Sequence, residues 1–171
     1  MKTCRIAPWC AALVLLCAVK SDRAYGQTLK EQLVGNWKLD SWNRVVDGKP
    51  EPGPFGPAPV GHHIFTADGY FCVAVMPPDR PKFPAADYRA GSLQEKASAF
   101  DTFVSYCGRY EANEQERSLL LRPDVSWFPN WTGTSLKRLV EVAGDRVTFK
   151  FRLPGLEGKT VESVFVWQRL K

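Results

Sequence analysis

Residues 147–153, Val-Thr-Phe-Lys-Phe-Arg-Leu, alternate apolar and polar side chains without interruption. Because successive side chains of an extended strand point to opposite faces, this pattern predicts a β-strand with one buried and one wet face. Asp68-Gly69 and Gly144-Asp145 are dipeptides typical of tight turns between such strands. We therefore expect the chain to be built from antiparallel hairpins.

The same period of two recurs in eight segments that are separated by turns or short insertions. They lie at about residues 35–46, 62–67, 70–76, 103–111, 117–122, 134–142, 147–153 and 160–169. An open sheet of this size would leave unpaired backbone groups along two edges, and closure of the sheet removes both edges. The pattern therefore predicts an all-β fold, an eight-stranded antiparallel up-and-down barrel, whose interior can hold one small ligand.

Two short helices are expected beside these strands. Each follows a capping-box pattern, in which a hydroxyl residue is followed three positions later by a glutamate. Thr28 with Glu31 predicts a helical turn near the start of the barrel, and Ser92 with Glu95 predicts a small helix before the fourth strand. Residues 48–61 contain five prolines, so we expect an irregular but stiff loop there, suited to act as a lid.

Residues 1–26 have the three parts of a secretory signal peptide. Lys2 and Arg5 form a basic start, residues 7–19 form an apolar run, and Ala24-Tyr25-Gly26 places small residues at a cleavage site. The apolar run is too short for a helix to cross a bilayer of ~30 Å, so no permanent membrane anchor is expected. Cleavage predicts a protein that is secreted or periplasmic.

Removal of this leader leaves residues 27–171 as one barrel domain. Lipid attachment at Cys17 is the competing interpretation, and the large Leu16 before it disfavours that processing. The whole chain of 171 residues has a net charge of +5, but the domain carries 19 basic and 17 acidic side chains, a net charge of +2. Because its basic residues are scattered, the composition excludes a nucleic-acid partner.

Cys72 and Cys107 are the two cysteines of the domain, since the other three leave with the leader. In an oxidising compartment an even pair permits one disulfide, and two buried thiols are the alternative. The cysteines would face each other across two neighbouring strands if residue 70 lay opposite residue 109.

Six short motifs occur in order along residues 33–170. They are Leu33-Val34-Gly35-Asn36-Trp37-Lys38-Leu39, Thr66-Ala67-Asp68-Gly69-Tyr70, Tyr106-Cys107-Gly108-Arg109-Tyr110, Phe128-Pro129-Asn130-Trp131-Thr132-Gly133-Thr134, Arg138 and Trp167-Gln168-Arg169. With these motifs the chain resembles the bacterial and fungal lipocalin-like domain family. The resemblance implies a calycin-type barrel, and it assigns no activity.

Within that resemblance, Gly35 and Trp37 match the Gly-x-Trp signature of lipocalins. It implies that Trp37 closes the floor of the barrel and that Arg169, near the end of the last strand, packs across it. A separate observation concerns Tyr106, Gly108 and Tyr110, which share one face of a strand. The missing side chain at Gly108 either leaves space for a ligand ring or relieves crowding where the strand bends.

Two tryptophans and one arginine complete the candidate site. Trp127 and Trp131 occur in an irregular stretch at one end of the barrel, where they line a pocket mouth or plug the core. Arg138 shares a strand face with apolar residues, so it requires a partner, either a ligand carboxylate or a structural acid. We predict a site for a small hydrophobic or amphipathic molecule formed by Tyr106, Tyr110, Trp127, Trp131 and Arg138.

The sequence contains no recognisable catalytic, metal or cofactor motif. The adjacent His62 and His63 point to opposite faces of a strand, so they cannot bind one metal together there, and no nucleotide-binding or hydrolase signature occurs. No cofactor and no metal are therefore predicted. The alternative function is a barrel enzyme, an isomerase, cyclase or hydrolase of a hydrophobic metabolite, with a lone acid–base residue such as His62 or Asp40.

Overall fold

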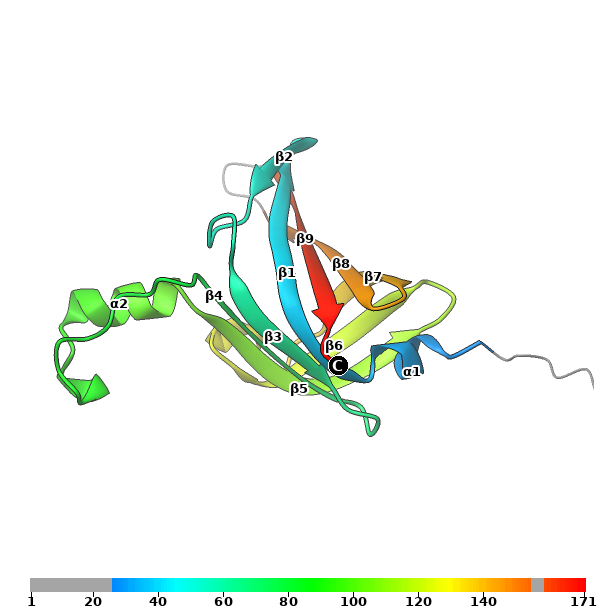
Figure 1. The fold of residues 1–171 in the computed structure, drawn as a ribbon, viewed down its shortest axis with the longest axis horizontal. Coiled ribbons are helices and arrows are strands. Elements are labelled where there is room, and N and C mark those ends of the chain that lie inside the picture. Colours follow the sequence, from blue (N-terminus) through cyan, green and yellow to red (C-terminus); the bar gives the residue numbers. More distant parts are fainter. Residues whose placement is uncertain (1–25, 155–158) are drawn as a thin grey trace, which may run out of the picture.

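One antiparallel sheet closes into a barrel with one extra strand. The computed structural model describes residues 26–154 and 159–171, so the predicted leader lies outside the described residues except for Gly26. The strands are β1 (Gly35–Val46), β2 (Lys49–Pro52), β3 (Val60–Phe65), β4 (Tyr70–Met76), β5 (Val104–Asn113), β6 (Ser118–Ser126), β7 (Leu136–Ala143), β8 (Arg146–Pro154) and β9 (Thr160–Arg169). Strands β3 to β9 pair in chain order, and β1 pairs with both β3 and β9 (Figure 1). The predicted eight-stranded barrel is confirmed.

Strand β1 closes the barrel because it is long enough to serve two neighbours. Its first residues pair with β3, and nearly its whole length pairs with β9. The register against β9 shifts between Leu39 and Ser41, and such an irregularity increases the local bend of a strand. Trp37 and Leu39 are buried while Lys38 and Asp40 are exposed, which is the alternation expected from the sequence.

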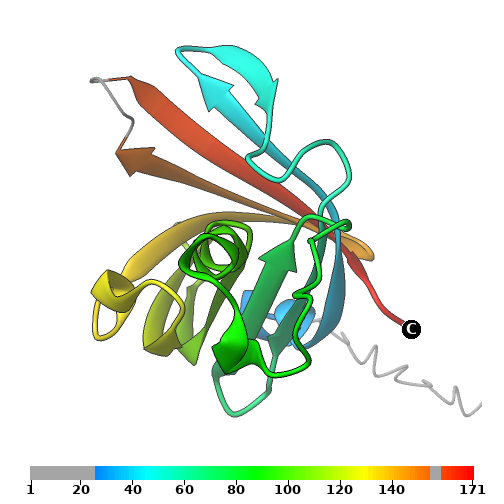
Figure 2. The same ribbon diagram turned by 90° about the vertical axis from the view of Figure 1, so that its left-hand side faces the viewer.

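Strand β2 corrects one prediction. The prolines of residues 48–61 predict irregular backbone throughout, yet Lys49–Pro52 pairs with the end of β1, with Pro50 opposite Val45. Because β2 lies at the edge of the sheet, the N–H group that proline lacks is not required by a further strand. The prediction is therefore wrong for these four residues, which form a hairpin that extends beyond the barrel (Figure 2, cyan).

A short helix covers one end of the barrel. Helix α1 (Leu29–Leu33) begins with the predicted capping box between Thr28 and Glu31, and both of its leucines are fully buried. The Leu33 carbonyl oxygen accepts a hydrogen bond from Nε1 of Trp37 at 2.8 Å. This bond attaches the helix to the floor of the barrel.

Arg169 completes the closed end. Its guanidinium carbon lies 4.1 Å from the centre of the Trp37 ring, the contact that the family resemblance implies. It donates hydrogen bonds to the carbonyl oxygens of Val34, at 2.8 Å, and of Gln32. The carboxylate of Asp145 lies 3.8 Å from its Nε. Most of its donors therefore have partners within the protein.

An arm of residues 77–103 connects β4 to β5 and extends away from the barrel (Figure 1). It contains the 3₁₀ turn η1 (Tyr88–Ala90) and helix α2 (Leu93–Asp101), which begins with the predicted capping box at Ser92. None of the residues of α2 is buried. Among the described residues, no helix is long and apolar enough to cross a membrane.

The two strands that carry the arm are also joined covalently. Tyr70 lies opposite Arg109, and in the same register Cys72 lies opposite Cys107. A disulfide connects the two cysteines, whose Cα atoms are 4.1 Å apart. It lies on the outer face of the barrel, because the alternating residues Val73 and Tyr106 face inward.

Candidate functional site

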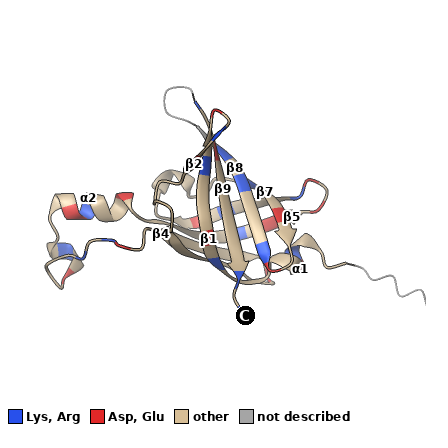
Figure 3. Cartoon of the chain, turned by 45° about the horizontal axis from the view of Figure 1, so that its top comes forward, with Lys and Arg blue, Asp and Glu red and all other residues tan. Residues whose placement is uncertain are grey.

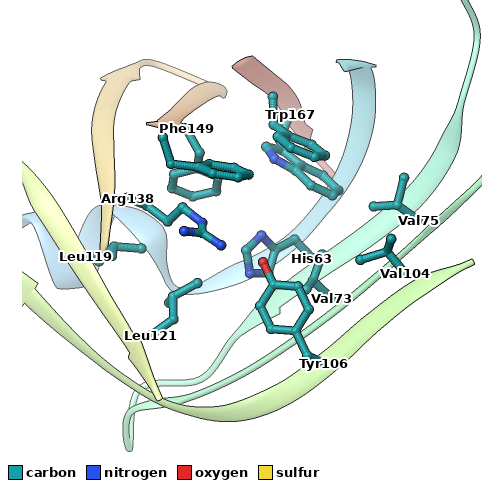
Figure 4. Close-up of a pocket in the computed structure, with 12 residues that line it drawn as sticks. His63, Val73, Val75, Val104, Tyr106, Leu119, Leu121, Arg138, Phe149 and Trp167 are labelled. Atoms are coloured by element: carbon teal, nitrogen blue, oxygen red, sulfur yellow. The ribbon is translucent and has the colours of Figure 1, made fainter. Parts of the chain in front are cut away.

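The barrel interior contains a narrow, mostly apolar cavity. The lining side chains leave little free space within it, and it opens to solvent at its mouth. Valines and leucines of β4, β5 and β6 form one wall, and Phe149, Phe165 and Trp167 of β8 and β9 form the other. Three polar side chains also face it, namely His63, Tyr106 and Arg138 (Figure 4).

His63 is the most unusual of the three because it is buried without a partner. The side chain is 3% exposed, and neither ring nitrogen has a hydrogen-bond partner among the described residues. Its ring centre lies 4.1 Å from that of Phe65 and 5.2 Å from that of Trp167. Burial, together with the charge of Arg138, lowers the pKa of His63 to about 3. At neutral pH the imidazole is therefore uncharged and offers the cavity one donor and one acceptor.

Arg138 brings a cation into the same space. It is 6% exposed, and its guanidinium carbon lies 3.7 Å from the centre of the Phe151 ring. Nη1 donates to the carbonyl oxygen of Lys137 at 3.0 Å, and Arg138 forms no ion pair with any described acid. The sequence left open a structural partner for Arg138, an acidic side chain of the protein. No such acid is found among the described residues. The guanidinium keeps donors that can bind a ligand.

Tyr106 completes the polar group from β5. It is 8% exposed, and its ring packs edge-on against Phe71 and Trp131, with ring centres 5.7 and 5.2 Å away. In Figure 4 its hydroxyl, the His63 ring and the Arg138 guanidinium point toward one another across the cavity. The fold thus gathers a phenol, a neutral imidazole and a guanidinium from β5, β3 and β7.

A further polar atom beside this cavity lacks a hydrogen-bond partner within the described residues. Nε1 of Trp167, which lines the cavity, is also buried without a hydrogen-bond partner in the described chain. A buried polar group without a partner costs about 1–3 kcal/mol, and nearly all such groups in folded proteins are paired. A bound molecule with its own hydrogen-bonding groups could supply the missing partners.

Three of the five predicted ligand residues, Tyr110, Trp127 and Trp131, do not line this cavity. Tyr110 faces inward as expected, but it lies near the closed end, where its hydroxyl donates to the Thr66 carbonyl oxygen at 2.9 Å. Nε1 of Trp127 donates to the Phe100 carbonyl oxygen at 3.0 Å, which attaches that ring to the end of α2. Trp131 does not line the cavity either, but it packs on Tyr106 and lines a groove outside the barrel.

Gly108 has a structural role. A Cβ atom at this position would collide with the carbonyl oxygen of Arg122 and approach the Cα of Pro123 to 2.8 Å. The register of β5 against β6 also shifts at this point, between Cys107 and Gly108. The interpretation of Gly108 as space for a ligand is wrong, because the neighbouring backbone occupies that space.

Sequence reasoning missed His63 as a site residue, although a signal was present. Gly61, His63 and Phe65 alternate with exposed residues along β3, and this pattern places the imidazole on the buried face. The neighbouring His62 is exposed on the outer face. No group of three or more metal-binding side chains occurs within the described residues.

Two comparisons with known proteins bear on this chain. The family model of the lipocalin-like domain matches residues 34–170. The 4'-hydroxy-3'-methoxypropiophenone carrier protein ppsC of Aspergillus oryzae is 26% identical over 103 residues, which are 56% of this chain and 93% of that protein.

Proposed function

We propose, from the premise that this chain belongs to the lipocalin-like domain family, that it binds and carries a small aromatic or amphipathic molecule inside its barrel. The observation that carries the proposal is the cavity itself, where His63 and Trp167 have buried nitrogens without partners inside apolar walls. Apolar pockets with a few convergent polar groups are typical of small-molecule sites. The Aspergillus oryzae relative is named as a carrier protein, which supports the same class of function.

The lining of the cavity favours a flat ring with oxygen substituents. Phe165 lies nearly parallel to Trp167, with an interplanar angle of 9°, and their ring centres are 6.0 Å apart. A planar ligand would pack along these rings, since offset stacking is the preferred arrangement of aromatic pairs. Arg138 and Tyr106 would donate to carbonyl, carboxylate or phenolate oxygens, and His63 would accept a hydrogen bond from a hydroxyl.

The relative's ligand is a suitable first probe because its name describes these groups. 4'-Hydroxy-3'-methoxypropiophenone is an aromatic ketone with a phenolic hydroxyl. We would titrate it, together with the neutral fluorescent probe N-phenyl-1-naphthylamine, into the purified protein and follow tryptophan or probe fluorescence. Saturable binding of at least one of them at one site per chain is the expected result. Binding of neither would contradict the proposal.

A matched pair of variants tests whether the molecule lies in the barrel. Val104 lines the cavity, whereas Val125 is 66% exposed on β6. Val104→Phe fills part of the cavity and should weaken binding about tenfold or more, and Val125→Phe adds the same ring outside and should change affinity less than about twofold. Thermal unfolding of both variants shows that they are folded. Equal affinities in the two variants would exclude a site in the cavity.

We also propose that carriage takes place outside the cytoplasm. The signal-peptide pattern of residues 1–26 supports this, as does a disulfide, which persists mainly in oxidising compartments. Mass spectrometry of the protein purified from its own cells tests the idea. A chain that begins at Gln27 and retains the Cys72–Cys107 bond is expected. A chain that keeps residues 1–26 and is recovered from the cytoplasm would contradict it.

A further inference from the structure

The barrel wall splits between the start of β7 and the end of β8. In the described part of these strands, pairing runs from Ala143–Arg146 to Leu139–Lys150 and goes no further. Beyond that rung, β7 stays with β6 and β8 stays with β9. The two strands therefore diverge, and a groove opens between them on the outside of the barrel.

Two residues form a shared wall between this groove and the cavity. Arg138 and Phe151 line both spaces, and the guanidinium carbon lies 3.7 Å from the centre of the ring. Arg138 directly precedes Leu139 of the last pair, so it lies where the pairing of β7 with β8 ends. The outer groove is wide, with an empty volume of about 1130 Å³ including open solvent.

The groove is also strongly basic. Besides Arg138 it is lined by Lys137, Lys150 and Arg152, and Glu162 is the one acid in its described lining. Figure 3 shows basic residues along β8. Lys137 and Lys150 are paired with Glu116 and Glu141, at 2.6 and 2.7 Å, so part of their charge is compensated. Arg152 forms no ion pair with any acid in the described part of the chain.

We propose that the cavity ligand carries an anionic end, and that this end lies at Arg138 and projects through the split into the basic groove. The proposal rests on the proposed function, because it orients the molecule carried in the barrel. An anion enclosed by apolar walls would be strongly destabilised. At Arg138 the same anion meets a guanidinium on its inner side and water with further cations on its outer side. The apolar body then lies toward Trp167 and Val73.

This orientation has a consequence for ligand selection. A carboxylate, sulfonate, sulfate or phosphate is favoured at the projecting end, and that end can carry a bulky polar substituent because it leads to solvent. The opposite, apolar end meets the closed interior, where added volume is not tolerated. The protein thus selects molecules by the size and shape of their apolar part.

Two matched probes separate this proposal from the proposed function. 8-Anilino-1-naphthalenesulfonate and N-phenyl-1-naphthylamine share an aromatic body, and only the first carries a sulfonate. Arg152→Glu reverses a charge in the groove without touching the cavity, and Lys38→Glu makes the same change on β1, where Lys38 is exposed. The affinity of both probes is measured for the wild type and both variants, at low salt and at about 0.5 M NaCl.

The expected result is specific to one probe and one variant. Arg152→Glu should weaken sulfonate binding about three- to fivefold at low salt, and the difference should shrink at high salt as the charges are screened. Its affinity for N-phenyl-1-naphthylamine, and the affinity of Lys38→Glu for both probes, should stay within about 1.5-fold of wild type. Equal sulfonate affinities in the two variants would overturn the basic groove as the anion's location. Failure of the sulfonate probe alone to bind wild-type protein would overturn the anionic end, whereas failure of both probes and of 4'-hydroxy-3'-methoxypropiophenone would overturn the proposed function.

Discussion

Arg169 and Arg138 both stack on aromatic rings, at 4.1 and 3.7 Å, but their surroundings differ. At the closed end, Arg169 donates to two backbone carbonyl oxygens and lies beside a carboxylate. In the cavity, Arg138 has one backbone carbonyl as its partner among the described residues, next to the unpartnered His63. An arginine at the closed end thus has partners for most of its donors within the protein, whereas an arginine in the cavity keeps donors that are free for a ligand.

This difference shows where stability and binding are expected to reside. Groups whose partners are all internal contribute to the folded state, and removing one leaves its partners unpaired. Groups without internal partners contribute little to stability, or lower it, and become favourable when a ligand pairs with them. Substitutions at the closed end should therefore change unfolding, and substitutions at the cavity should change affinity.

The largest effect is expected at Trp37. The ring is fully buried, and its Nε1 binds the end of α1. Trp37→Ala should lower the free energy of unfolding by about 3–5 kcal/mol, the range for deleting a large buried aromatic side chain. Urea unfolding measures this loss, with Tyr88→Ala as the control because Tyr88 is 77% exposed and should cost less than about 0.5 kcal/mol. A loss at Trp37 below about 1 kcal/mol would contradict its role as the barrel floor.

Arg169→Met should cost about 2–4 kcal/mol of stability, because the carbonyl oxygens of Val34 and Gln32 would lose their charged donor. The unbranched methionine keeps part of the contact with Trp37. Affinity for 8-anilino-1-naphthalenesulfonate should change less than about twofold once the protein is folded. A large loss of affinity in a stable variant would show that the closed end takes part in binding.

Because its pKa is lowered by burial, His63 should make the free energy of unfolding depend on pH. Its pKa is about 3 in the folded state and about 6.5 when unfolded, so the unfolded chain binds a proton more readily between these values. Acid therefore favours unfolding, and the contribution of His63 should fall by about 2–3 kcal/mol from pH 7.5 to pH 4.5. Urea unfolding at both pH values would show this loss in the wild type and its absence in His63→Leu. Identical pH dependence of the two proteins would place His63 in contact with solvent.

Arg138→Met should have the smallest effect on stability and a clear effect on affinity. Replacing a buried charge that lacks an ionic partner by an apolar side chain should change the free energy of unfolding by less than about 1 kcal/mol. A charge-assisted hydrogen bond contributes about 1.5–3 kcal/mol, so sulfonate affinity should fall about 10- to 150-fold. Fluorescence titration measures this loss, with neutral N-phenyl-1-naphthylamine as the control. If Arg138→Met lowered the stability but left sulfonate affinity unchanged, the contrast between Arg138 and Arg169 would be wrong.

The fold was largely predictable because the alternation of apolar and polar residues along each strand indicates which side chains face the core. It placed Arg138 and Tyr106 inside the barrel, and the register it required for the cysteines, Tyr70 opposite Arg109, is the one observed. Alternation tells which face a residue occupies, but not its height along the barrel. Tyr110 therefore shares the inward face of Tyr106 and still lies at the closed end, because height depends on strand tilt and stagger.

The remaining differences arise from contacts between segments that are distant in sequence. The role of Gly108 depends on the backbone of Arg122, which approaches only after β5 and β6 have paired. The split beside Arg138 depends on where pairing between β7 and β8 stops, and each of those strands alternates normally by itself. The burial of His63 was readable from β3, but its lack of partners became visible only in the closed barrel.

The disulfide between β4 and β5 makes the arm part of a covalent ring. Its cysteines are 35 positions apart, and the arm with its exposed Arg89 lies between them. A protease that cuts after Arg89 would open the backbone, but the two fragments would remain one molecule until the disulfide is reduced. The arm can therefore be nicked, lengthened or replaced by a foreign loop while Val73 and Tyr106 stay aligned across the same pair of strands.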